Sequence, residues 1–205
     1  MFGYHGDRYT TIGTKLARRK KVRIYDDLNN LVCIVRDRMV RAGRQITVFG
    51  DEGEEAPLLH LMAQNGRDPD PSYTVLDSSG DRRIGSIRRS GKEWLIMDSS
   101  QKEIARLRKK RTVDIIRDTE LGSLPRGYVI EMDRSARIVA EIGGGGPFSG
   151  RHHADFSTDD AHLLDRRLGI SALLVHIVNG KEKSRAARQA VNGFTYYNRR
   201  KTDHV

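Results

Sequence analysis

The stretch LGISALLVHIV, residues 168–178, is apolar on every side when it is wound as a helix. A helix without a polar face must be buried all round, either in lipid or within protein. These eleven residues are about half of the roughly 20 that a bilayer requires. Burial within the protein is therefore the better explanation, and we expect no transmembrane span.

Capping signals bound this helix at both ends. The Asn-Gly pair at 179–180 is typical of a C-terminal cap, and Ser157 or Thr158 is suited to cap the start. The two aspartates at 159–160 complement the positive end of the helix dipole. The pattern predicts a helix over about 159–179.

Four short hairpins of one pattern precede the helix. In each, a run rich in β-branched and aromatic residues ends in Asp, a polar turn follows, and a second such run returns. The four aspartates are Asp26, Asp77, Asp98 and Asp133. The return strands share the order aliphatic, small, any residue, aliphatic: Val32–Val35, Ile84–Ile87, Ile104–Leu107 and Val139–Ile142. The small and the second aliphatic residue lie two apart, so they share one face that leaves room beside a bulky neighbour.

A weaker hairpin pairs Ile46–Phe49 with Leu58–Met62, and Thr112–Arg117 supplies another strand, for a total of about eleven. The aspartates are 51, 21 and 35 residues apart, whereas a solenoid or propeller recurs at a fixed period. A single closed or nearly closed antiparallel sheet fits better. The alternative is an all-β domain of another kind, since such hairpins are common in β proteins.

Hairpins of this form, followed by a helix with an apolar second half, resemble the tubby C-terminal-like superfamily, in particular the phospholipid scramblases and the LURP-one-related proteins. The resemblance covers about Val22 to Val178. It implies a mainly β (α+β) fold, a closed antiparallel β-barrel of about 12 strands around the C-terminal hydrophobic helix. The expected organisation is a basic N-terminal segment at 1–21, the barrel at 22–180 and a basic C-terminal tail at 181–205.

Two properties of animal scramblases transfer poorly. Their acidic segment before the helix, thought to bind calcium, corresponds to residues 155–160, but helix capping explains these acids more simply. A helix-loop-helix calcium site needs a bidentate Glu at its twelfth position, where counting from Asp155 gives Arg166. The cysteine cluster that is palmitoylated in animal scramblases has no counterpart in this sequence, whose single cysteine, Cys33, falls in a strand. We expect no cofactor, calcium being suggested by the resemblance alone.

The chain of 205 residues carries 37 Lys and Arg against 27 Asp and Glu, a formal charge of +10. Such a balance favours polyanionic partners, either an anionic membrane surface or nucleic acid. One cysteine allows no intramolecular disulfide, and the first residues do not follow the pattern of a signal peptide. The sequence predicts a cytoplasmic protein, with peripheral attachment to a membrane as a further expectation.

Three basic clusters are the candidate binding residues for an anionic ligand. They are Arg18, Arg19, Lys20 and Lys21; Arg108, Lys109, Lys110 and Arg111; and, in the tail, Arg199, Arg200 and Lys201. Near an anionic membrane each basic residue contributes about 1 kcal/mol. On nucleic acid the same residues would contact phosphates without sequence preference. For any single cluster a solvated face is the competing interpretation, and whether the clusters form one surface stays open.

Catalytic signals are weak. The glycines at 143–146 lack the following Lys-Ser/Thr of a phosphate-binding loop, and His152 and His153, being adjacent on an extended segment, point opposite ways. We therefore expect no catalytic residues, no metal site and no enzyme. The leading hypothesis is a scramblase-like or LURP-one-like protein that binds anionic phospholipid surfaces through basic patches. The alternatives are a nucleic-acid-binding protein of tubby-like fold, a protein-interaction scaffold, and a lipid transporter whose helix inserts in the bilayer.

Overall fold

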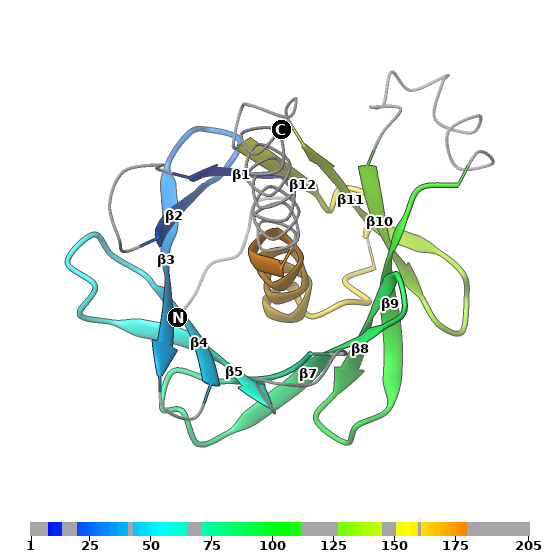
Figure 1. The fold of residues 1–205 in the computed structure, drawn as a ribbon. Helices are drawn as coiled ribbons and strands as arrows, with labels where there is room; N and C mark the ends of the chain where they lie inside the picture. The colour runs from blue at the N-terminus through cyan, green and yellow to red at the C-terminus, as the bar shows by residue number, and fades with distance from the viewer. Residues whose placement is uncertain are drawn as a thin grey trace, which may run out of the picture. The chain divides into compact units, whose positions relative to one another are not determined.

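The computed structural model describes residues 8–13, 20–40, 43–64, 71–111, 127–144, 151–159 and 161–179. These residues form a closed antiparallel barrel of twelve strands and a C-terminal helix, as predicted (Figure 1). The strands are β1 (Arg8–Gly13), β2 (Lys20–Tyr25), β3 (Leu31–Val40), β4 (Gly43–Phe49), β5 (Pro57–Gln64), β6 (Ser72–Leu76), β7 (Arg83–Ser90), β8 (Glu93–Asp98), β9 (Glu103–Lys109), β10 (Gly127–Met132), β11 (Ile138–Gly144) and β12 (Arg151–Asp155).

The barrel is a simple meander in which every strand pairs with the next one along the chain. The ring closes where β1 pairs with β12, in a register that runs from Arg8 opposite Asp155 to Ile12 opposite Arg151. Closure leaves no strand edge exposed between the first and last strands. It also places the two ends of the meander side by side.

Two strands were not predicted. Strand β1 lies in the segment that we expected to precede the barrel, and β12 contains the adjacent residues His152 and His153. Both are short and largely polar, and they pair with each other across 139 residues or more, so local patterning does not reveal them. The strand expected over 112–117 lies outside the described residues, as does the predicted tail at 181–205.

The inner face of the barrel carries the small residues that the return strands predicted. Each small residue and the aliphatic residue two positions later are buried, as alternation along a strand requires. These pairs are Cys33 with Val35, Gly85 with Ile87, Ala105 with Leu107, and Ala140 with Ile142. Burial raises the pKa of the Cys33 thiol to about 12, so this side chain is poorly suited to lipid attachment.

The helix begins at residue 166, seven residues later than the 159 that we predicted. Asp165 caps it, because its carboxylate accepts a hydrogen bond from the backbone N–H of Arg167 at 2.9 Å. Asp159 instead begins a turn, in which the backbone N–H groups of residues 163 and 164 donate to its side chain. The same residue type favours either a cap or a turn, which is why the sequence misplaced the helix start.

The chain divides into two compact units, Met1–Leu173 and Leu174–Val205. The first contains the barrel and the start of the helix, with Leu168 and Leu173 fully buried. Leu168 packs against Gly85 of β7, and Gly169 packs against Phe156, so the helix begins inside the ring of strands (Figure 1). Of the second unit the structure describes residues 174–179, which continue the helix. No described helix combines the length and the hydropathy of a membrane span.

Candidate functional site

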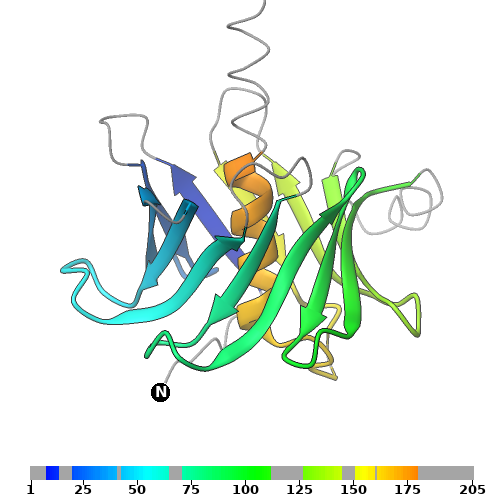
Figure 2. The same cartoon turned by 60° about the horizontal axis from the view of Figure 1, so that its bottom comes forward.

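The meander brings one type of turn to one end of the barrel. Every even-numbered strand finishes at this end, and each is followed by a turn that contains an aspartate: Asp26, Asp51, Asp77, Asp98, Asp133 and Asp159. We call it the aspartate end. Figure 2 shows the hairpin turns that the bar colours cyan, green and yellow-green gathered along the lower edge. The sequence predicted four of these aspartates but not their alignment at one end.

These turns share their local structure. In five of them the aspartate side chain accepts a backbone N–H from four or five residues later: Asn30, Glu55, Arg82, Lys102 and Leu163. In all six, the residue three after the aspartate has a positive φ: Asn29 (64°), Glu54 (60°), Gly80 (80°), Gln101 (68°), Ala136 (51°) and His162 (48°). The carboxylates thus hold strained turns together, which gives them a structural role.

Hydrogen bonding also keeps three of these carboxylates charged. The Asn30 side chain lowers the pKa of Asp26, the Ser79 hydroxyl lowers that of Asp77, and the Ser100 hydroxyl lowers that of Asp98. A hydrogen bond to the ionised form favours that form. These three carboxylates therefore stay ionised at neutral pH.

The opposite end of the barrel, which we call the basic end, carries exposed cations. Arg38 lies near the end of β3, Arg88 and Lys92 flank the tip of the β7–β8 hairpin, and Lys109 ends β9. Among the described residues these four form no ion pair. Among the described residues the acids at this end are fewer than the cations: Asp37 is held by Arg44 at 2.6 Å, and Glu93 lies near Arg106. In the described turns of the aspartate end carboxylates outnumber cations, so the described parts of the two ends are oppositely charged.

The predicted cluster at 108–111 lies at the basic end but is not one patch. Its side chains alternate across the strand, so Arg108 and Lys110 lie on the outer wall while Lys109 faces the mouth of the barrel. Arg108 pairs with Glu131, and the Lys110 Nζ lies 2.8 Å from a Glu141 oxygen across the intervening strand. Both cations are buried. Lys109 and Arg111 are exposed, so two of the four predicted residues face solvent.

The other predicted clusters are described only in part. Lys20 and Lys21 begin β2, which places them at the basic end with the 108–111 cluster, although their side chains lie outside the described residues. Arg18, Arg19, Arg199, Arg200 and Lys201 also lie outside the described residues. The structure thus brings two of the three clusters to one end of the barrel, on opposite sides of its ring.

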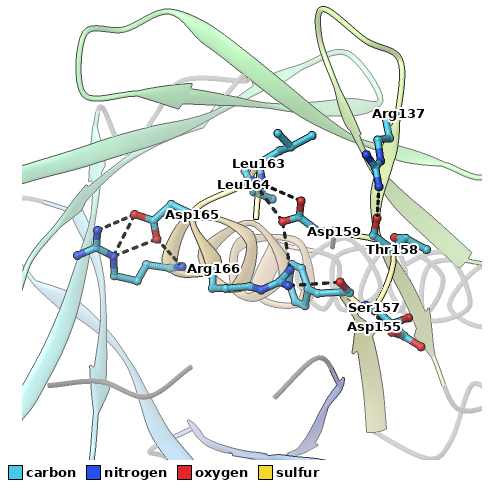
Figure 3. Close-up of polar contacts among 11 residues, drawn as sticks. Arg137, Asp155, Ser157, Thr158, Asp159, Leu163, Leu164, Asp165 and Arg166 are labelled. Carbon is cyan, nitrogen blue, oxygen red and sulfur yellow. Dashed lines mark hydrogen bonds and ion pairs between the residues drawn. The ribbon is translucent and has the colours of Figure 1, made fainter. Parts of the chain in front are cut away.

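The acidic segment before the helix is tied to the barrel by nitrogen donors (Figure 3). The Asp159 carboxylate is fully buried and accepts the backbone N–H of Leu163 at 2.7 Å and the Arg166 guanidinium at 3.3 Å. Arg166 lies over the Phe156 ring, 4.7 Å from its centroid. Asp155 accepts from the Ser157 backbone N–H and pairs with Arg8. These oxygens serve the fold, and the described residues contain no gathering of three His, Cys, Asp or Glu side chains suited to a metal.

The cations of the β7–β8 hairpin were not among the predicted binding residues. The stretch Arg88-Arg89-Ser90-Gly91-Lys92 holds three cations around a two-residue turn, in which Gly91 takes a positive φ of 58°. This spacing was a usable signal, since a tight turn brings its flanking residues to one tip. Its importance depends on which end of the barrel the turn occupies, and that follows only from the strand order.

No protein-family model matches the sequence, and no curated protein matches it. Among solved structures, the chain is similar to a protein from Arabidopsis thaliana known from an X-ray structure. The two share 13% sequence identity with a TM-score of 0.52, over 85% of this chain and 91% of that chain. At this identity the similarity shows a shared fold and nothing finer.

Proposed function

We propose that this protein is a non-enzymatic member of the scramblase-like and LURP-one-like group of the tubby C-terminal-like superfamily. It binds anionic phospholipid surfaces peripherally, with the basic end of its barrel toward the membrane. The observation that carries the proposal is the separation of charge between the two ends. A field of this kind orients a protein before contact and holds its positive side at an anionic surface.

The outer wall of the barrel is a poorer candidate for this contact. Five cations on this wall are paired with carboxylates: Arg8 with Asp155, Arg36 with Glu54, Arg106 with Glu103 and Asp133, Arg108 with Glu131, and Lys110 with Glu141. An ion pair within the protein leaves little net field for an external ligand. The four exposed cations of the basic end form no such pair among the described residues, so their charge can attract an external anion.

The expected strength suits reversible attachment. Four exposed cations at about 1 kcal/mol each would supply roughly 4 kcal/mol, which corresponds to millimolar affinity before any other contact. The anionic leaflet of a cell faces the cytoplasm, so the proposal places the protein there.

Insertion of the helix into the bilayer is disfavoured by its packing. Leu168, Ile170 and Leu173 are fully buried, and Leu168 is fitted against a glycine in the wall. Withdrawing the helix would expose these side chains and the apolar inner wall to water. At about 25 cal/mol per Å² of exposed apolar area, the cost would exceed the stability of a typical domain.

Co-sedimentation of the full chain with vesicles tests the proposal. Neutral phosphatidylcholine vesicles, vesicles that also contain phosphatidylserine, and a random DNA duplex are compared at low and physiological salt. We expect binding to the anionic vesicles that persists at physiological salt. Binding to DNA alone would overturn the proposal in favour of the nucleic-acid alternative, and binding to neither would favour a protein partner.

A further inference from the structure

Three neighbouring strands place two cations and one aromatic ring on the inner side of the basic end. Arg89 of β7 lies opposite Trp94 of β8, and Trp94 lies opposite Leu107 of β9, two residues before Lys109. Because Gly85, Ile87 and Leu107 face inward, the alternation of side chains turns Arg89 and Lys109 to the same side. We call Arg89, Trp94 and Lys109 the inner row.

Arg89 is held in place without using its full hydrogen-bonding capacity. Its guanidinium lies over the Trp94 ring, 5.4 Å from the centroid, and its Nε donates to the Gly91 carbonyl at 2.9 Å. Trp94 is itself fixed, being buried against Tyr73. The two terminal nitrogens of Arg89 have no partner among the described residues. A guanidinium oriented in this way is prepared for a bidentate contact with phosphate.

Lys109 supplies a second positive charge within reach of the first. The strands β7 and β9 are separated by β8 alone, so their backbones are about 10 Å apart, and both side chains are long enough to close much of that gap. Lys109 is exposed and forms no ion pair within the described part of the chain. Two cations over a short span match the two charges of a phosphomonoester near neutral pH.

We propose that the inner row binds one phosphomonoester headgroup of a membrane lipid. The inference rests on the proposed function and adds a ligand class to it. A phosphodiester headgroup carries one negative charge on its phosphate and would leave one of the two cations uncompensated. The row therefore prefers phosphatidic acid to phosphatidylserine when the vesicles carry equal charge.

Arg88 and Arg89 form a natural matched pair for testing this. They are adjacent and identical in charge, but Arg88 points outward and is exposed, whereas Arg89 points inward over Trp94. We expect Arg88→Gln to weaken binding to both kinds of anionic vesicle by about fivefold, the effect of one surface charge. Arg89→Gln should weaken binding to phosphatidic acid vesicles at least tenfold and abolish the preference for them. Lys109→Gln, which leaves the Trp94 contact intact, should act as Arg89→Gln does.

The single tryptophan gives an independent signal. Phosphatidic acid vesicles should change Trp94 fluorescence in the wild type and in Arg88→Gln but not in Arg89→Gln, while glycerol 3-phosphate should compete only weakly because it lacks the membrane contact. Strong binding of glycerol 3-phosphate alone would overturn the assignment to a lipid. Unfolding midpoints check that each variant is folded.

The two proposals fail differently. If the wild type binds anionic vesicles but Arg88→Gln and Arg89→Gln weaken binding equally, or phosphatidic acid is not preferred, the inner row is not a headgroup site and the proposed function stands. If the wild type binds no anionic vesicle of either kind, both proposals are wrong.

Discussion

Gly85 in the barrel wall and Leu168 in the helix are fitted to each other. A Cβ added at Gly85 would lie 2.9 Å from the Leu168 Cδ2, and it would also collide with the Met97 carbonyl oxygen of the neighbouring strand. The barrel wall therefore has a residue without a side chain where the helix presents a leucine. This relationship explains why the return strand β7 carries a glycine on its inner face at position 85.

Gly85→Ala should destabilise the protein by about 1–3 kcal/mol, since the added methyl group overpacks a site bounded partly by backbone. Gly53→Ala is the matched control, because a Cβ there meets other atoms only at 3.6 Å or beyond. Urea denaturation of both variants measures the difference. Equal effects would show that the wall does not press on the helix.

Asp159→Ala should cost about 3–5 kcal/mol, because it leaves the Arg166 cation nearly buried without its carboxylate. Asp155→Ala removes an ion pair whose arginine is 68% exposed, so its cost should stay below about 1 kcal/mol. The free energies of unfolding of the two variants provide the comparison. A small loss in Asp159→Ala would mean that the turn before the helix does not depend on this buried pair.

The third residue after each aspartate has a positive φ, so replacing alanine by glycine there and replacing glycine by alanine should change stability in opposite directions. Ala136→Gly should stabilise the protein by up to about 1 kcal/mol, since it relieves a left-handed alanine at 51°. Gly80→Ala should destabilise it by a similar amount, because its φ is 80°. The space around Gly80 accepts a methyl group, so the effect would come from the backbone conformation and not from a clash. Thermal unfolding midpoints test the pair. Shifts of the same sign in both would contradict the turn geometry.

Acid should destabilise the protein through the turn aspartates. Hydrogen bonds lower the pKa of Asp26, Asp77 and Asp98 in the folded state, so the unfolded chain takes up protons first as the pH falls. Their contribution to stability is complete above the ordinary carboxyl pKa of about 4 and is lost below it. The triple variant with Asn at these positions should show a shallower loss of stability between about pH 4 and pH 2. Parallel acid profiles for variant and wild type would contradict this assignment.

The features that the sequence predicted correctly depend on residues that are close together in the chain. The hairpins and the inward face of Cys33, Gly85, Ala105 and Ala140 depend on residues within about ten positions of each other, and these predictions are confirmed. Strand β1 depends on a partner at the other end of the barrel, and its six residues carry too few apolar positions to stand out. The helix start was wrong because an aspartate at 159 suits a turn as well as a cap.

The candidate site shows the same limit. The cluster at 108–111 is visible as a run of charge, but the carboxylates that pair with Arg108 and Lys110 come from Glu131 and Glu141, 23 and 31 residues away. The basic end shows the opposite: its cations are scattered along the sequence, and only the strand order brings them together. Once twelve strands in a closed meander are known, alternate turns must lie at opposite ends, and the separation of charge can be derived.

The most direct test of the account compares two variants that lose the same charge at different ends. One carries Arg38→Gln, Arg88→Gln and Lys92→Gln at the basic end, and the other carries Arg82→Gln, Lys102→Gln and Arg134→Gln at the aspartate end. All six residues are exposed, and none belongs to the inner row. At about 1 kcal/mol per contacting cation, the first variant should bind anionic vesicles at least tenfold more weakly than the wild type, while the second should bind almost as well as the wild type. Equal losses in the two variants would contradict the account, because binding would then follow net charge and not the basic end of the barrel.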